Sequence, residues 1–209
     1  MNAGPVGPLN ASPAPDEIVR AFIAVHINDA VRDELARAQA RLKRSGAHVA
    51  WVRPENVHLT LVFLGDVSGR QLAELASRLD RIALVTAAFS CVAAGIGAFG
   101  GERRPRVVWA GVMAGCVPAL HSLYGAASDA AVAAGMRVEA WPFAAHMTLG
   151  RVRSSRNVAA LAAEVGKLRE SSFGVFPVHG VSVMRSVLGS QGPTYTVLHE
   201  ATFSGEGRS

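Results

Sequence analysis

Two copies of one four-residue pattern carry the chemistry that this sequence offers. Residues 58–61 read His-Leu-Thr-Leu, and residues 146–149 read His-Met-Thr-Leu. Side chains two residues apart on a β-strand point to the same face, so the His and Thr of each copy share a face. The residues between them then point into a core. In a chain with seven His, chance predicts far fewer than two copies.

Such a pair of strands is suited to acid–base chemistry at phosphorus. An imidazole with a pKa of about 6.5 exists in both protonation states near neutral pH, so two of them can act as general acid and general base. Threonine hydroxyls can donate hydrogen bonds to charged oxygens. We therefore expect His58 and His146 to approach one phosphorus site from opposite walls of a groove, beside Thr60 and Thr148. Either motif alone would be better explained as a buried histidine bonded to a neighbouring threonine.

The elements that must position these residues follow from hydrophobic periodicity. The order strand, helix, strand, helix, strand is predicted twice, with Gly65-Asp66 ending the second strand and a capping box at residues 68–71. Strands are expected over residues 21–27, 56–64, 89–99, 106–112, 146–152, 175–185 and 195–203, and helices over 31–42, 72–82, 118–131 and 157–169.

This repeated order predicts an internal duplication. The fold class we expect is α+β: a two-lobed, duplicated fold in which each lobe is an antiparallel-rich sheet with helices on its outer face. A central cleft is expected between the lobes. The single domain is expected to span residues 17–203, with flexible tails at 1–16, which is rich in Pro, and at 204–209.

Composition restricts the class of protein. Half of the residues are hydrophobic and 18% are charged, which supports a sizeable core and excludes a disordered chain. The net charge of +5 and arginine-rich clusters at 41–44, 103–106 and 151–156 favour an anionic partner. Cys91 and Cys116 lie in apolar runs without a C-x-x-C partner, which predicts buried, reduced thiols and a cytoplasmic location.

Other functions are less well supported. Residues 82–101 carry no charge but are rich in Ala and Gly, so we expect no membrane span. Residues 1–16 lack a basic segment and an apolar core, so we do not expect them to be a signal peptide. Residues 95–100 match G-x-G-x-x-G but lead into another strand, which favours a strand-to-strand loop over a dinucleotide site. The remaining histidines are scattered, so no metal and no cofactor are expected.

Residues 54–66 and 142–151 resemble the twin signatures of the two-histidine (2H) phosphoesterases. Within that superfamily the chain resembles the bacterial and archaeal RNA 2′,3′-cyclic phosphodiesterases, which are also named 2′-5′ RNA ligases. The likeness extends from residues 20–24 to 195–198 and includes 106–109 and 184–186. This sequence departs from the family signature in one place: Ala144 and Ala145 stand where the family usually has a polar or basic residue and a Pro.

The resemblance implies a metal-free hydrolase that opens a terminal 2′,3′-cyclic phosphate of RNA to a 2′-phosphate. It implies that His58 is the proton donor to the 3′ oxygen, that His146 is the proton acceptor that activates water, and that Thr60 and Thr148 hold the phosphate oxygens. The partner would be RNA with a cyclic phosphate end, or a small cyclic nucleotide. We expect a monomer without membrane association.

Five further residues are weaker candidates for substrate binding. Arg151, Arg185 and Tyr195 match family positions, although regular strand alternation would turn Arg151 away from the second histidine. Trp51 and Phe22 could stack on a nucleobase, with core burial favoured for Phe22 and Trp51 the better candidate. Three alternatives stay open: RNA ligation through a 2′-5′ linkage, hydrolysis of a non-RNA cyclic phosphate, and non-catalytic binding of RNA ends.

Overall fold

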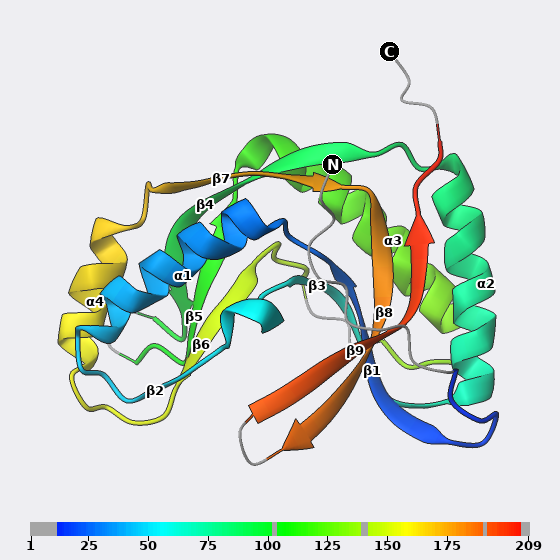
Figure 1. Ribbon diagram of the computed structural model, residues 1–209, viewed down its shortest axis with the longest axis horizontal. Helices are drawn as coiled ribbons and strands as arrows, with labels where there is room; N and C mark the ends of the chain where they lie inside the picture. The colour runs from blue at the N-terminus through cyan, green and yellow to red at the C-terminus, as the bar shows by residue number, and fades with distance from the viewer. Residues whose placement is uncertain (1–11, 102–103, 139–141, 190–191, 206–209) are drawn as a thin grey trace.

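One curled sheet forms the framework of the protein (Figure 1). The computed structural model describes residues 12–101, 104–138, 142–189 and 192–205. Over these residues the strands are β1 (Ile18–Val25), β2 (Val49–Trp51), β3 (Leu59–Ser68), β4 (Phe89–Phe99), β5 (Val107–Val112), β6 (Met147–Val152), β7 (Ser172–Val178), β8 (Gly180–Gly189) and β9 (Gly192–Thr202). The α-helices are α1 (Asp29–Lys43), α2 (Gly69–Val85), α3 (Val117–Ala133) and α4 (Val158–Lys167), with 3-10 turns η1 (Pro54–Asn56) and η2 (Ala114–Cys116).

The sheet consists of two parts that meet at one residue pair. The strand order is β7-β4-β5-β6-β3-β1-β8-β9, with β2 beside β6, and all of these pairings are antiparallel. Between β3 and β6, only Leu59 pairs with Met147. We call β2, β4, β5, β6 and β7 the β6 lobe, and β1, β3, β8 and β9 the β3 lobe.

The helices cross between these lobes. Helices α1 and α4 pack against each other and against strands of the β6 lobe, whereas α2 and α3 pack on the β3 lobe (Figure 1). Yet α1 follows β1, which belongs to the β3 lobe, and α3 follows β5, which belongs to the β6 lobe. The expected α+β fold with two antiparallel lobes is confirmed, but each lobe takes elements from both halves of the sequence. Neither half could therefore bury its core alone.

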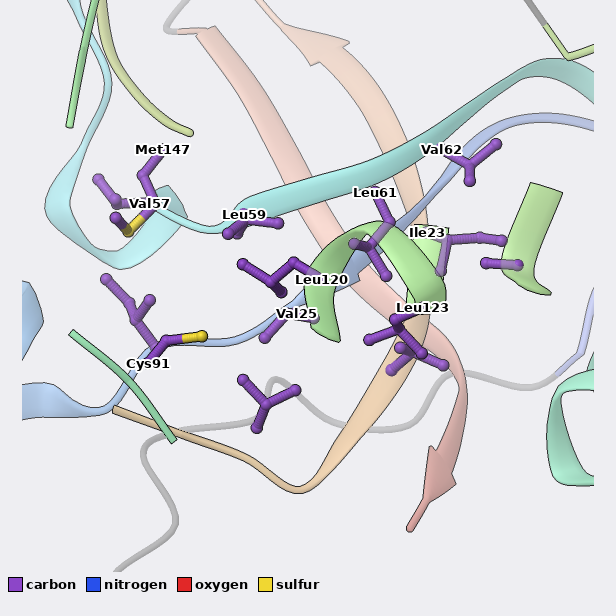
Figure 2. Packing of buried hydrophobic residues seen from close by; sticks show 14 of the residues in the cluster. Ile23, Val25, Val57, Leu59, Leu61, Val62, Cys91, Leu120, Leu123 and Met147 are labelled. Carbon is purple, nitrogen blue, oxygen red and sulfur yellow. The ribbon is translucent and has the colours of Figure 1, made fainter. Parts of the chain in front are cut away.

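Local signals set most of the helix ends. The predicted capping box at α2 is present: the Ser68 side chain accepts from the N–H of Gln71, and the Gln71 side chain accepts from the N–H of Ser68. Pro118 lies in the first turn of α3, and Gly135 beyond its end adopts φ +78°. Figure 2 shows Leu120 and Leu123 of α3 within the core that Leu59 and Leu61 of β3 enter from the other side.

Three strand predictions were wrong in detail. Gly65 does not end β3, because its φ of +69° accommodates an irregular pairing and the strand continues to Ser68. The single strand expected over residues 175–185 is two strands, β7 and β8, with His179 between them. The glycines of the G-x-G-x-x-G match lie largely inside β4, where Gly97 leaves room for an aromatic ring: a Cβ there would lie 2.3 Å from Trp109.

Residues just beyond both ends of the expected domain form hydrogen bonds to α2. The N–H of Arg70 donates to the carbonyl of Pro15 at 2.9 Å, so residues 12–16 are attached to the start of α2. Ser204 and Gly205 donate to carbonyls of Ala83 and Thr86 at the end of the same helix. The rest of the expected tails, 1–11 and 206–209, lies outside the described residues. Within the described chain, no helix combines the length and the apolar character needed to cross a bilayer.

Candidate active site

The two His-x-Thr motifs meet where the two lobes join. The residue that follows each histidine forms the joining pair, Leu59 with Met147, and both side chains are fully buried. Because the pair unites the same position of both motifs in antiparallel strands, an approximate two-fold axis passes through it. His58 and His146 are therefore placed at equivalent positions on either side of the junction.

A cavity of about 770 Å³ opens beside this junction. Most of the residues expected from the sequence line it: His58, Thr60, Thr148, Arg151, Tyr195, Trp51 and Phe22. We call this space the central cavity. His146 is not one of its lining residues; its ring contacts Phe99 instead, with the centroids 4.9 Å apart. The cavity thus unites one histidine and both threonines directly, and Thr148 of the second motif lines it without its histidine.

Backbone carbonyl groups fix the same tautomer in both histidines. Nδ1 of His58 lies 2.7 Å from the carbonyl oxygen of Asn56, and Nδ1 of His146 lies 2.7 Å from that of Ala144. A carbonyl oxygen can only accept, so Nδ1 carries the proton in each ring. In the neutral ring Nε2 is then an acceptor, and for His58 the hydroxyl of Thr60 donates to it at 3.0 Å. Nε2 is therefore the atom that can exchange a proton with a ligand.

Aromatic rings hold the imidazole of His58 in place. Phe22 stacks on it with the centroids 4.8 Å apart, and Tyr195 meets it edge-on at 5.2 Å. Phe22 is only 4% exposed, so its face is occupied by the histidine, and it supports that ring instead of offering a platform for a base. Tyr195 contacts Phe22 as well, at 5.1 Å. The three rings form one rigid cluster on the cavity wall.

The surroundings of both histidines disfavour the charged form. Burial lowers the pKa of His58 to about 4, against the opposing hydrogen bond to Asn56, and the nearby charges of His26 and His146 lower it further. Burial also lowers the pKa of His146, and the Arg151 guanidinium adds to that shift. Both are neutral at pH 7 when the cavity holds no anion.

A β-bulge after each motif decides which residues enter the central cavity. The pairing of β3 with β1 skips Leu61 and again Leu64, and the pairing of β6 with β5 skips Leu149. The skips at Leu61 and Leu149 are equivalent in the two motifs. Each of these two residues is the third after its histidine. An extra residue reverses the alternation of side chains up to the next skip, so Phe63 and Arg151, each five residues after its histidine, line the cavity. With the regular alternation of side chains assumed from the sequence, both Phe63 and Arg151 would point away from the central cavity.

A buried glutamine on α1 stabilises the bulge in β6. Gln39 is 1% exposed, and its amide donates to the carbonyl oxygens of Leu149 at 2.8 Å and Val52 at 2.9 Å. The carbonyl of Leu149 also accepts from the N–H of Val52 at 2.9 Å, so Gln39 adds a second bond to it and finds partners for its own buried amide. Gln39 gave no signal in the sequence beyond its place on the apolar face of a helix.

Arg185, like His146, is not among the lining residues of the central cavity. Its guanidinium pairs with Glu17 at 3.1 Å. Its neighbour Ser186 lines the central cavity, and adjacent side chains on a strand point to opposite faces. Arg185 therefore lies on the other face of β8, and we leave it out of the candidate site.

Three arginines in the cavity, Arg20, Arg53 and Arg137, were missed by sequence reasoning, whereas Arg153 belongs to the cluster at residues 151–156. Arg20, Arg53, Arg137 and Arg153 line the central cavity together with Arg151, and the lining contains no Asp or Glu among the described residues. Such a one-sided charge attracts anions. The cluster at residues 151–156 was the one signal that pointed to this lining, because the other three arginines are distant in sequence. The described chain also holds no cluster of three or more His, Cys, Asp or Glu that could bind a metal ion.

Comparisons with known proteins identify the family. The model of the LigT like phosphoesterase family matches residues 25–109. The RNA 2′,3′-cyclic phosphodiesterase of Methanothermobacter thermautotrophicus is 36% identical over 85% of this chain and 95% of its own length. The RNA 2′,3′-cyclic phosphodiesterase of Thermotoga maritima is 33% identical over 90% of this chain and 97% of its own length.

Solved structures agree with these sequence matches. A crystal structure from Thermus thermophilus is 31% identical, with a TM-score of 0.71 over 90% of this chain and 100% of that one. The crystal structure of E. coli LigT complexed with 3′-AMP, 24% identical over 90% of this chain and 99% of that one, shares the fold with a TM-score of 0.73. Because several relatives above 30% identity are covered along nearly their whole length, this chain belongs to the LigT-like phosphoesterase family.

Proposed function

We propose that this protein hydrolyses the terminal 2′,3′-cyclic phosphate of RNA and leaves a 2′-phosphate and a free 3′ hydroxyl. The observation that carries the proposal is the pair of histidines at the lobe junction. Each has Nδ1–H bound to the carbonyl two residues before it, which leaves Nε2 for proton transfer. The names of the relatives, RNA 2′,3′-cyclic phosphodiesterase, support the same substrate.

The proposed reaction is one displacement at phosphorus. The neutral imidazole of His146 takes a proton from water at Nε2, and the water oxygen bonds to phosphorus. The bond from phosphorus to the 3′ oxygen breaks, and His58, protonated, gives its Nε2 proton to that oxygen. Thr60 and Thr148 donate hydroxyl hydrogen bonds to the non-bridging oxygens. The assignment of donor and acceptor rests on the family resemblance of the two motifs.

Binding of the substrate prepares the donor for this step. With a pKa of about 4, His58 is neutral in the free protein at pH 7. The negative charge of a bound phosphodiester favours the charged imidazolium and raises the pKa of both histidines. A proton taken from solvent then resides on His58, and the Thr60 hydroxyl, released from Nε2, turns to the phosphate.

The pH dependence of kcat/KM follows from the lowered pKa values. A base must be neutral and an acid protonated, and kcat/KM reports both groups in the free enzyme. Because both pKa values lie below the ordinary 6.5, kcat/KM is expected to be highest below pH 6.5 and to fall about tenfold per pH unit on the alkaline side. The pH optimum of kcat is expected to lie above that of kcat/KM, because the bound anion raises the pKa values of both histidines. A kcat/KM optimum above pH 7 contradicts this expectation.

The arginine lining favours an RNA chain over a small cyclic nucleotide. Each phosphate contact with single-stranded RNA contributes about −0.7 to the slope of log K against log salt. Arg151→Gln is expected to lower kcat/KM on an RNA oligomer about 10–100-fold, as for a charged hydrogen bond of about 1.5–3 kcal/mol, and to reduce the salt slope by about one contact. Arg185→Gln is the matched control on the opposite face of the sheet. An equal effect of both variants would rule out a specific role for Arg151.

A product analysis tests the proposed function as a whole. RNA ending in a 2′,3′-cyclic phosphate is incubated with the protein in chelator, with and without a second RNA that carries a 5′ hydroxyl. A 2′-phosphate product supports the proposal. A ligated product, turnover restricted to non-RNA cyclic phosphates, or binding without turnover would each contradict the proposal and support the corresponding alternative. We further propose a cytoplasmic monomer, because one chain builds the whole central cavity and Cys91 and Cys116 are buried free thiols.

A further inference from the structure

One side chain ties the hairpin of β8 and β9 to His58. The amide nitrogen Nδ2 of Asn56 donates to the carbonyl oxygen of Pro193, near the start of β9, at 2.9 Å. The backbone carbonyl of the same Asn56 accepts the Nδ1 proton of His58 at 2.7 Å. Asn56 closes the short turn η1, where its own N–H donates to the carbonyl of Arg53 at 2.9 Å. A single residue thus contacts both the hairpin and the histidine.

The hairpin is a wall of the central cavity. Ser186 and Leu188 of β8 and Gly192, Pro193 and Tyr195 of β9 all line it. The Leu188 side chain is 74% exposed, so an apolar surface is open to whatever fills the cavity. In Figure 1 the joined ends of β8 and β9 project away from the helices. A ligand that contacts this wall therefore contacts the element to which Asn56 is attached.

The second motif lacks this attachment. Ala144 occupies the position equivalent to Asn56, and its carbonyl holds His146 at the same 2.7 Å distance. An alanine side chain offers no hydrogen bond to a neighbouring element. The two histidines therefore share a backbone geometry, but only the turn before His58 is anchored by a side chain at this position.

We propose that Asn56 is a positioning residue that holds the carbonyl acceptor of His58 against the β8–β9 hairpin and so fixes the Nδ1–H tautomer of that ring. Arg53, which precedes η1, also donates to the carbonyl oxygen of Pro193, at 3.3 Å. Without the shorter bond from Asn56, only this long, exposed bond joins the turn to Pro193, and the carbonyl of Asn56 moves relative to the ring. The Nε2–H tautomer then becomes populated, and the nitrogen that faces the reaction no longer has the defined protonation that proton transfer requires. The kinetic part of this inference rests on the proposed function.

The test compares two variants of Asn56 with one control. Asn56→Ala removes the side chain, whereas Asn56→Asp keeps its shape but, when ionised, only accepts and so cannot donate to Pro193. Glu55→Gln is the matched control: Glu55 is exposed, lies in the same turn, and pairs with Arg53 at 3.5 Å. Nitrogen-15 NMR of the histidine rings, at a pH where they are neutral, reports the tautomer without requiring activity. Circular dichroism confirms that each variant folds.

We expect the Nδ1–H form of His58 in the wild type and in Glu55→Gln, and a mixture of tautomers in both Asn56 variants. On the RNA end, kcat is expected to fall about 10–100-fold, the size seen when a partner that orients a functional histidine is removed, with KM within about threefold. An unchanged tautomer in either folded Asn56 variant, or a loss in KM alone, overturns the inference. A wild type that does not turn over the substrate refutes the proposed function instead, and the NMR comparison still decides the role of Asn56.

Discussion

Replacing His146 by Ala is expected to lower kcat/KM on RNA with a 2′,3′-cyclic phosphate end by about 10²–10⁴-fold, the contribution of one positioned proton transfer. His58→Ala is expected to cause a loss of similar size, because the displacement needs both a proton acceptor and a proton donor. The double variant is expected to lose less than the product of the two single effects, since the two rings serve one transition state. Initial rates at subsaturating substrate measure all three.

His199→Ala provides the control for these variants. His199 bonds to Asp80 at 2.7 Å and does not line the central cavity, so its loss is expected to leave kcat/KM within about twofold of wild type. Residual activity close to that of the wild type in either His58→Ala or His146→Ala would remove the basis of the proposed mechanism.

The second large effect concerns the junction of the lobes. Met147 is fully buried and pairs with Leu59 across the one contact that joins β3 to β6 in the described sheet. Met147→Ala is expected to lower the free energy of unfolding by about 2–5 kcal/mol, because it removes packed atoms and leaves a cavity. Urea denaturation followed by circular dichroism measures this difference.

Met113→Ala is the matched control for that measurement. Met113 is 53% exposed, so the same truncation is expected to change the free energy of unfolding by no more than about 0.5 kcal/mol. If both variants lowered the free energy of unfolding by the same small amount, the junction would not be the tightly packed contact that holds the two histidines together.

Local patterns in the sequence predicted most elements and the central chemistry. The apolar stripe Leu72, Leu75 and Leu79 and the capping box at Ser68 describe α2 well, because helix faces and caps depend on residues within one or two turns. The His-x-Thr motifs were equally local. Strand ends were predicted less well: Gly65 looked like a terminator, although a φ near +69° serves an irregular pairing inside β3 just as well.

The exchange of helices between lobes was beyond sequence reasoning. Periodicity shows that α1 and α3 each have an apolar face, but it does not show which strands cover that face. An apolar helix face can be buried equally well against either lobe. Which lobe a helix packs on therefore depends on how all the strands and helices are arranged. The same applies to the anchoring of residues 12–16 and 204–205 at the two ends of α2, which the sequence had assigned to tails.

By itself, the sequence determined which groups can do chemistry here: two imidazoles and two hydroxyls, each pair separated by one apolar residue. Only the tertiary structure decided what surrounds them. Bulges at Leu61 and Leu149 bring Phe63 and Arg151 into the central cavity, while Arg185 stays outside it. The physical reason is that strand side chains alternate with a period of two, so one residue skipped against a neighbouring strand reverses the side chains that follow it, up to the next skip. In β6, the carbonyl of the skipped Leu149 accepts hydrogen bonds from Gln39 on a distant helix and from the N–H of Val52.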